Sequence, residues 1–302
     1  MKNIATDLAV ESKEFISKKS DIDGVLSEEF SDNGFNITKI DILTENAARM
    51  LSKDIGRYIT IDLKNVLNIP DIKTITEVIK RQLETLFPHK SFKNILVVGL
   101  GNRDMTPDSL GPLTTDFTLV TRHLKDALPD YFKNEILNTV SAIIPGVLGK
   151  TGIESQESIK SAVENINPDL VIVIDALASR GIKRLTNTIQ MSNTGLCPGG
   201  GVGNKRREIS KNTLGTEVLS IGVPTVCDLA TLCYDILSII NDENIHSHHE
   251  KIENALIKDN NFLISINEID EVIIKLSKIL GYSINRFLHK GLSFEEMESF
   301  LS

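Results

Sequence analysis

The chain has 302 residues, 41% of them hydrophobic and 25% charged, which is enough to bury about three quarters of its unfolded surface. Its 33 basic and 41 acidic side chains leave a net charge of −8, which argues against direct binding to nucleic acid. The three cysteines form no C-x-x-C pair, and the first residues lack the apolar run of a signal peptide. Since no uncharged run reaches the roughly 18 residues of a membrane span, we expect a cytoplasmic protein with no membrane partner.

The first predicted elements lie in the N-terminal third. The region up to about Pro70 is charged, which indicates a peripheral position, although the alternation over residues 58–63 predicts a half-buried strand. An amphipathic helix follows, because apolar residues recur at helical spacing behind Asp71, a candidate N-cap, and stop before Pro88.

Three short apolar runs, at residues 95–99, 170–174 and 218–223, predict strands covered on both faces, as in a parallel sheet. Helical patterns lie among and after them, at residues 113–128, 157–166 and 227–240. We therefore predict an α/β protein of three layers, α/β/α, with a mainly parallel sheet and peripheral N-terminal strands.

The C-terminal part is predicted to be helical. Residues 241–251 are polar enough for a surface loop or linker, and residues 268–280 have the pattern of a helix. Residues 293–301 predict a short helix, with Ser293 and Glu296 spaced as a capping box.

Several familiar motifs are incomplete. The run from Gly99 follows a predicted strand, but Asp104 replaces the third glycine of G-x-G-x-x-G, and its carboxylate would repel a pyrophosphate. The glycine-rich run from Gly199 to Lys205 lacks P-loop spacing, so a substrate-contacting loop is favoured. No serine lies in G-x-S-x-G and no H-E-x-x-H is present. We expect neither a cofactor nor a metal.

Carboxylates follow the predicted strands, where open α/β sheets bind ligands. Asp108 lies after the first of them, near the start of the next helix, and Asp175 is the first residue after the second. One ionised carboxylate can take a proton from water while a protonated partner polarises a scissile carbonyl. The helix start favours the anion at Asp108, and the apolar run favours the neutral acid at Asp175. The alternatives stay open: the reverse assignment of acid and base is equally compatible with the sequence, and Asp108 as an N-cap and Asp175 as a partner of loop amides are the non-catalytic interpretations.

Six blocks, in order along the chain, carry a resemblance to a known family: residues 97–102, 106–112, 141–147, 174–180, 198–206 and 221–226. They resemble the germination proteases of spore-forming bacteria, endopeptidases that degrade small acid-soluble spore proteins. The similarity runs from about Thr6 to about Tyr234, and the stretch from Asn241 matches little of the pattern.

The resemblance implies an atypical aspartic protease with a fold similar to hydrogenase maturation proteases. The two catalytic aspartates of the family map onto Asp108 and Asp175, with Asp104 and Asp116 as weaker candidates. The D-[TS]-G motif of pepsin-like enzymes is absent.

The segment from Thr6 to Glu11 is similar to the family's autoprocessing site. The resemblance thus implies a zymogen cleaved between Asp7 and Leu8, with residues 1–7 as propeptide and 8–302 as a single peptidase domain whose core spans about 90–240. The alternative is that Asp7 caps a helix starting at Leu8.

The implied function is to begin the degradation of small acid-soluble spore proteins during germination, in the cytoplasm of the forespore or spore core, by a homo-oligomer, with a tetramer implied by the family. Lys205 and Arg206 are expected to orient acidic substrate residues, or else to form a solvated basic turn. Two other functions remain open: a metal-dependent peptidase with Asp104, Asp108 and Asp175 as ligands, or a non-catalytic binder of spore proteins.

Overall fold

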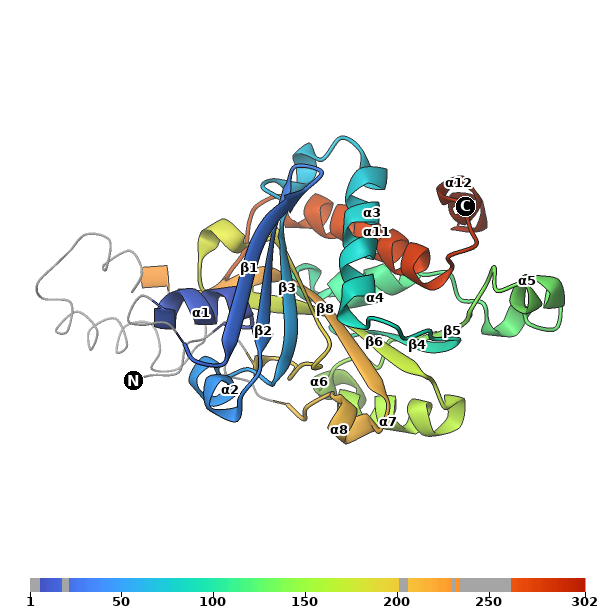
Figure 1. Ribbon diagram of the computed structural model, residues 1–302, viewed down its shortest axis with the longest axis horizontal. Coiled ribbons are helices and arrows are strands. Elements are labelled where there is room, and N and C mark those ends of the chain that lie inside the picture. The colour runs from blue at the N-terminus through green and yellow to red at the C-terminus, as the bar shows by residue number, and fades with distance from the viewer. Residues whose placement is uncertain (1–5, 18–21, 201–205, 230–231, 234–261, 302) are drawn as a thin grey trace, which may run out of the picture.

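A computed structural model describes the chain except for residues 1–5, 18–21, 201–205, 230–231, 234–261 and 302. In this part of the chain one mixed sheet has the order β1-β2-β3-β7-β8-β6-β4-β5, and β9 pairs with β8 (Figure 1). The strands are β1 Val25–Asp32, β2 Phe35–Ile42, β3 Gly56–Asp62, β4 Asn94–Gly99, β5 Thr139–Ile143, β6 Leu170–Ser179, β7 Thr188–Ser192, β8 Glu217–Asp228 and β9 Leu263–Ile264.

Helices cover both faces of this sheet. The α-helices are α1 Ala9–Ser17, α2 Glu45–Leu51, α3 Ile72–Leu86, α4 Leu110–Asp116, α5 Pro129–Lys133, α6 Leu148–Thr151, α7 Ser155–Ile166, α8 Lys211–Leu214, α11 Ile269–Leu288 and α12 Phe294–Leu301. In Figure 1, α3 and α11 cross one face, and α7 and α8 lie on the other. The predicted three-layer α/β class is therefore confirmed. None of the described helices is long and apolar enough to span a membrane.

The sheet is mixed, so the prediction of a mainly parallel sheet is wrong. β4 pairs in parallel with β5 and β6, and β6 with β8, but the other pairings are antiparallel. The difference comes from the hairpin β1–β2, whose turn residues Asn33 and Gly34 have φ of 50° and 83°. Such an Asn-Gly pair favours a tight hairpin, and the hairpin extends the sheet through β3 to β7.

The core extends beyond the predicted span of residues 90–240. The largest buried cluster joins the sheet to α3 and α11, and includes Ile59 and Ile61 of β3 and Leu276 of α11. β3 is therefore an internal strand of the sheet, whereas the sequence indicated a peripheral region. Alternate residues of β4 and β6 face two different clusters, which explains their continuous apolar runs.

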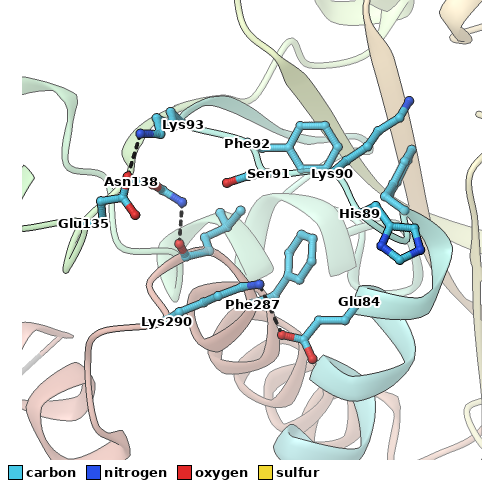
Figure 2. A pocket seen from close by; sticks show the side chains of 12 residues that line it. Glu84, His89, Lys90, Ser91, Phe92, Lys93, Glu135, Asn138, Phe287 and Lys290 are labelled. Carbon is cyan, nitrogen blue, oxygen red and sulfur yellow. Dashed lines mark hydrogen bonds and ion pairs between the residues drawn. The ribbon is translucent and has the colours of Figure 1, made fainter.

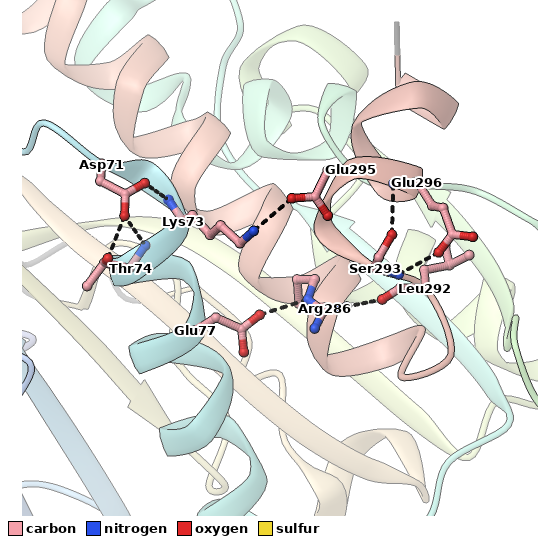
Figure 3. Close-up of polar contacts among 9 residues, drawn as sticks. All are labelled: Asp71, Lys73, Thr74, Glu77, Arg286, Leu292, Ser293, Glu295 and Glu296. Atoms are coloured by element: carbon pink, nitrogen blue, oxygen red, sulfur yellow. Dashed lines mark hydrogen bonds and ion pairs between the residues drawn. The ribbon is translucent and has the colours of Figure 1, made fainter.

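The predicted helix behind Asp71 is confirmed as α3, and Asp71 caps it by accepting bonds from the N–H groups of Lys73 and Thr74. Figure 3 shows the polar contacts that join α3 to the C-terminal helices. Arg286 of α11 bonds Glu77 of α3 at 2.8 Å, and Lys73 bonds Glu295 of α12 at 2.7 Å.

The predicted capping box of α12 is also present. The Ser293 N–H donates to the carboxylate of Glu296 at 2.8 Å, and the Glu296 N–H donates to the Ser293 hydroxyl at 3.2 Å (Figure 3). The two bonds satisfy N–H groups that the first helical turn leaves without partners.

The predicted helix over residues 113–128 is wrong. α4 ends at Asp116, and a short 3-10 helix, Arg122–Leu124, follows. The side chain of Asn285 on α11 donates to the Phe117 carbonyl and accepts from the Leu119 N–H, so a distant helix bonds the chain as it leaves α4. Sequence periodicity cannot reveal such a partner.

The predicted helix over residues 227–240 is wrong at its start, because Cys227 and Asp228 belong to β8. Residues 232 and 233 are helical, and residues 234–240 lie outside the described residues. The predicted helix over residues 157–166 is confirmed as α7.

α11 ends eight residues beyond the predicted end at Leu280, and Gly281 lies inside it. A glycine at this place suggests a helix end, but here it lies inside the helix, where an added Cβ would lie 2.5 Å from the Cβ of Phe117. We expect Gly281→Ala to destabilise the fold by about 1–2 kcal/mol, since overpacking exceeds the gain in helix propensity. Gly149→Ala is the matched control, because no atom of the described residues lies within 4 Å of its added Cβ. Urea unfolding measures both, and equal stabilities would contradict the close packing.

Candidate active site

Asp175 lies inside strand β6, because that strand continues to Ser179 and does not end before Asp175 as the apolar run suggested. β4 ends at Gly99, opposite Ile174, so Asp175 is the first residue of β6 beyond the end of β4. Its side chain is 6% exposed, and Oδ1 accepts a hydrogen bond from the Ala176 N–H at 3.0 Å. The sheet thus places a buried carboxyl at the carboxyl end of its parallel strands.

Asp108 returns to the same end of the sheet through a tight turn. It closes the 3-10 helix Thr106–Asp108, just before α4, near the position predicted for it. The Asn102 N–H donates to Asp108 Oδ2 at 2.9 Å. Gly101 makes the turn possible, because its φ is 114° and a Cβ there would lie 2.0 Å from the Asp108 carbonyl oxygen.

The two carboxyl groups interact with each other. Burial raises the pKa of Asp175 well above its ordinary value, and the charges of Asp108 and Asp7 raise it further. Burial also raises the pKa of Asp108, but the Asn102 N–H and the positive charge of Arg206 oppose that rise. The structure therefore favours a proton on Asp175 and the anion on Asp108.

The other candidate residues are placed differently. Asp104 is exposed and pairs with Lys150, and Asp116 forms a bidentate pair with Arg103 at 2.7 and 2.8 Å. Lys205 lies outside the described residues. Arg206, whose N–H donates to the Pro198 carbonyl at 3.3 Å, lowers the pKa of Asp108 through its positive charge.

The N-terminal segment lies against β6. Asp7 forms two bonds with Ala178: its N–H donates to the Ala178 carbonyl at 3.0 Å, and its Oδ2 accepts from the Ala178 N–H at 2.8 Å. Leu8 is completely buried in an apolar cluster formed by β2, α2, β3 and Leu177. α1 begins at Ala9, one residue after the start proposed in the capping alternative.

Two side chains hold the carbonyl oxygen of Asp7. Lys53 Nζ donates to it at 2.9 Å and Gln190 Nε2 at 3.0 Å, while Gln190 Oε1 accepts from the Ala9 N–H at 2.7 Å. The sequence analysis identified neither residue. No local motif could mark them, because α2 and β7 lie more than 130 residues apart and meet only in the folded sheet.

Glu11 also has its own set of partners. Its carboxylate, 5% exposed, accepts bonds from the N–H groups of Arg180 at 2.8 Å and Gly181 at 2.9 Å, and from the Thr6 hydroxyl. Arg184 lies 3.9 Å away. Glu11, the fourth residue after the Asp7–Leu8 bond, is therefore held by specific hydrogen bonds, as Asp7 is.

One cleft with a volume of about 620 Å³ has walls that include Asp7, Lys53, Asp175, Gln190 and Gly200. A different cavity of about 340 Å³ lies near the amino end of β4 (Figure 2). Figure 2 shows two of its lysines directed at glutamates, Lys93 at Glu135 and Lys290 at Glu84. Its charges are neutralised in pairs and it lies at the other end of the strand, so the chemistry belongs to the first cleft.

No three His, Cys, Asp or Glu residues in the described part of the chain are grouped so that they could hold a metal ion. Of the three ligands in the metal alternative, Asp104 is paired with Lys150. The residues present form a carboxyl pair beside a bound peptide segment.

An α/β sheet that holds a carboxyl pair against a peptide segment defines a candidate peptidase, and comparison with known proteins identifies its family. The profile of the germination protease family matches residues 3–258, and the chain belongs to that family. A germination protease of Clostridium perfringens is 40% identical over the whole of both chains. That of Bacillus pumilus is 33% identical over 98% of this chain and 96% of its own.

Among solved structures, a nickel–iron hydrogenase maturation protease from Thermococcus kodakarensis overlaps 67% of this chain and 98% of its own, with 16% identity and a TM-score of 0.34. The family membership rests on the sequence match, and it makes the chain a peptidase of spore germination.

Proposed function

We propose that this protein is an aspartic-type endopeptidase that cleaves itself between Asp7 and Leu8 and then begins the degradation of small acid-soluble spore proteins in the spore core. One observation carries the proposal: the carbonyl oxygen of Asp7 accepts hydrogen bonds from Lys53 and Gln190, and the carboxylate of the same residue raises the pKa of Asp175. Residues 1–7 would be the propeptide and residues 8–302 the peptidase domain. A homotetramer stays a prediction from the family, to be measured by analytical ultracentrifugation.

The carboxyl pair can activate water without a metal. Asp108, favoured as the anion, takes a proton from the attacking water, and Asp175, favoured as the neutral acid, supplies one to the leaving nitrogen. The difference in surroundings supports this assignment, since Arg206 and the Asn102 N–H stabilise negative charge at Asp108 only.

The same contacts supply a reason for the inactivity of a precursor. A segment tethered to the domain competes with any substrate for the cleft at a high effective concentration. Cleavage after Asp7 removes that residue's bonds to Ala178, Lys53 and Gln190, which weakens the anchoring of Leu8 and α1. Substrate can then displace Leu8 and α1.

The partners of Glu11 support recognition of an acidic residue four positions after the cut. Replacing Glu11 by Gln places an amide NH₂ against backbone donors, and the loss of charge-assisted bonds costs about 1.5–3 kcal/mol. We expect self-cleavage to slow about tenfold or more. Glu14→Gln is the matched control, because Glu14 is 54% exposed and pairs with Arg184 at the surface. Equal rates for both variants, followed by intact mass, would remove Glu11 from substrate recognition.

The test of the proposal is acid incubation of the purified protein, followed by intact mass. Loss of Met1 to Asp7 is the expected result, together with cleavage into two fragments of the peptide Thr-Glu-Phe-Ala-Ser-Glu, which repeats the pattern of residues 6–11: an acidic residue, a large apolar one, Ala and, two residues on, Glu. Activity that a chelator abolishes would support the metal-dependent alternative instead. A peptide that binds but stays intact would support the non-catalytic alternative.

A further inference from the structure

The carbonyl oxygen of Asp7 has the surroundings of an oxyanion site. It accepts from Lys53 Nζ at 2.9 Å and from Gln190 Nε2 at 3.0 Å, and both distances lie in the range that suits a developing oxyanion. Neither donor belongs to the carboxyl pair. Both line the cleft that also contains Asp175.

The fold fixes Lys53 before any reaction. Ser52 ends helix α2 in the left-handed region with φ of 52°, and the Lys53 N–H returns to the Ala48 carbonyl at 3.1 Å. Such a C-terminal cap sets the direction in which the chain and the next side chain leave the helix. Lys53 also donates to the Thr6 carbonyl at 3.3 Å, so the ammonium spans two consecutive carbonyl groups.

Gln190 is fixed equally well. It lies on β7, paired with Thr60 of β3 on one side and with Gly222 of β8 on the other, and it is 9% exposed. Its amide makes two bonds of opposite kind to the segment: Nε2 donates to the Asp7 carbonyl, and Oε1 accepts from the Ala9 N–H. Together these bonds set the position of the peptide bond that lies between Asp7 and Leu8.

We propose that Lys53 and Gln190 are catalytic residues that stabilise the oxyanion formed when water attacks the carbonyl after an acidic residue, first at Asp7 and then in substrates. The inference rests on the proposed function, because it names the hydrogen-bond donors to the carbonyl oxygen of the peptide bond that the proposed function cleaves. In this mechanism Lys53 and Gln190 stabilise the oxyanion, and the carboxyl pair only transfers protons.

The electron pairs and protons balance in two steps. The water oxygen bonds to the Asp7 carbonyl carbon, Asp108 takes a water proton, and the displaced electron pair moves onto the carbonyl oxygen between Lys53 and Gln190. When the carbonyl re-forms, the bond to the Leu8 nitrogen breaks and that nitrogen takes the proton of Asp175. The products are a carboxyl group at Asp7 and an amine at Leu8.

Burial gives these donors their effect. Desolvation lowers the pKa of Lys53, while the carboxylates of Asp7, Asp54 and Glu11 oppose that change. In a partly desolvated cleft, a fixed donor stabilises charge more than it would in bulk solvent, and removing one costs about 10²–10³-fold in kcat.

The test compares Lys53→Met and Gln190→Glu with wild type, using self-cleavage by intact mass and hydrolysis of Thr-Glu-Phe-Ala-Ser-Glu. Gln190→Glu keeps the acceptor for the Ala9 N–H and loses the donor to the Asp7 carbonyl. Lys211→Met and Gln156→Glu, on α8 and α7, are the matched controls. Circular dichroism and Tm establish that each variant is folded, and Lys53→Arg provides a second variant that retains a cationic donor.

We expect both variants to lose about 10²-fold or more in the self-cleavage rate and in kcat, with KM changed far less, and Lys53→Arg to recover part of the rate. A raised KM with unchanged kcat would overturn the inference, since the residues would then only bind substrate. Wild-type rates in folded variants would also overturn it and leave the proposed function intact. Wild-type protein that cuts neither itself nor the peptide would refute the proposed function itself.

Discussion

Asp175→Asn should abolish self-cleavage and peptide hydrolysis while making the folded protein more stable at neutral pH. Asparagine keeps the shape of the side chain and an oxygen that can accept from the Ala176 N–H, but it cannot supply a proton. Loss of one acid–base group lowers kcat by about 10²–10⁴-fold. Asp108→Asn should be equally inactive, because an amide cannot take a proton from water.

The gain in stability follows from the sign of the pKa shift. The folded protein holds the Asp175 proton more tightly than the unfolded chain does, because burial and the charges of Asp108 and Asp7 raise its pKa. As pH rises above the unfolded pKa, the unfolded chain loses this proton first, so the stability of the fold falls until the pH reaches the folded pKa, and the whole loss remains above it. Asparagine removes that cost, and relief of such active-site strain commonly returns about 0.5–2 kcal/mol.

Urea unfolding at pH 7 and at pH 3, beside activity, measures both effects. The stability difference between Asp175→Asn and wild type should be present at pH 7 and should nearly vanish at pH 3, where both states hold the proton. Asp104→Asn is the control, since Asp104 is exposed and its pKa is lowered by Lys150. An active Asp175→Asn protein would end its assignment as a catalytic acid.

Local sequence signals predicted the parts of the fold that depend on local interactions. Some signals depend only on residues close in sequence, and each of these predicted its element. They are the N-cap Asp71, the capping box at Ser293 and the apolar runs of β4 and β6. The helix after Asp108 was predicted too long, because its end depends on Asn285, more than 160 residues away. The last long helix was predicted to end at Leu280, whereas α11 continues through Gly281 to Leu288, and Phe117 packs on that glycine from another part of the chain.

The candidate site also has one part that local sequence signals predicted and another part that they did not. The carboxylates were predicted because strand ends in α/β sheets bind ligands, and the structure brings Asp108 and Asp175 within electrostatic reach of each other. Lys53 and Gln190 carried no signal, since they come from an N-terminal region interpreted as peripheral and from an unpredicted strand. The antiparallel extension through β3 and β7 is what brings donors to the Asp7 carbonyl.

Self-cleavage should accelerate as pH falls from about 8 toward 5 and should slow again at lower pH, in a bell-shaped profile. The active form needs a proton on Asp175 and none on Asp108. Above the raised pKa of Asp175 that proton is lost, and the rate falls about tenfold per pH unit; below the pKa of Asp108 the base is protonated and the rate falls again. An absence of acid preference between about pH 5 and 8 would contradict the carboxyl pair.

Arg206→Gln should move the acid limb of this profile to higher pH. The positive charge of Arg206 lowers the pKa of Asp108, so its removal lets Asp108 take up a proton at higher pH and narrows the active range from the acid side. Arg207→Gln is the matched control, because Arg207 is exposed and pairs with Glu157 on α7.

Rates should be measured only in samples shown to be folded. Burial lowers the pKa of His289 to about 4, so the unfolded chain gains a proton below its own pKa of 6.5 and the fold loses stability as pH falls. First-order rates from intact mass, with circular dichroism of the same samples, therefore separate catalysis from acid unfolding. If Arg206→Gln and Arg207→Gln share one acid limb, Arg206 does not stabilise the Asp108 anion, and the difference between the two carboxyl groups must come from burial, the Asn102 N–H and the charges around Asp175.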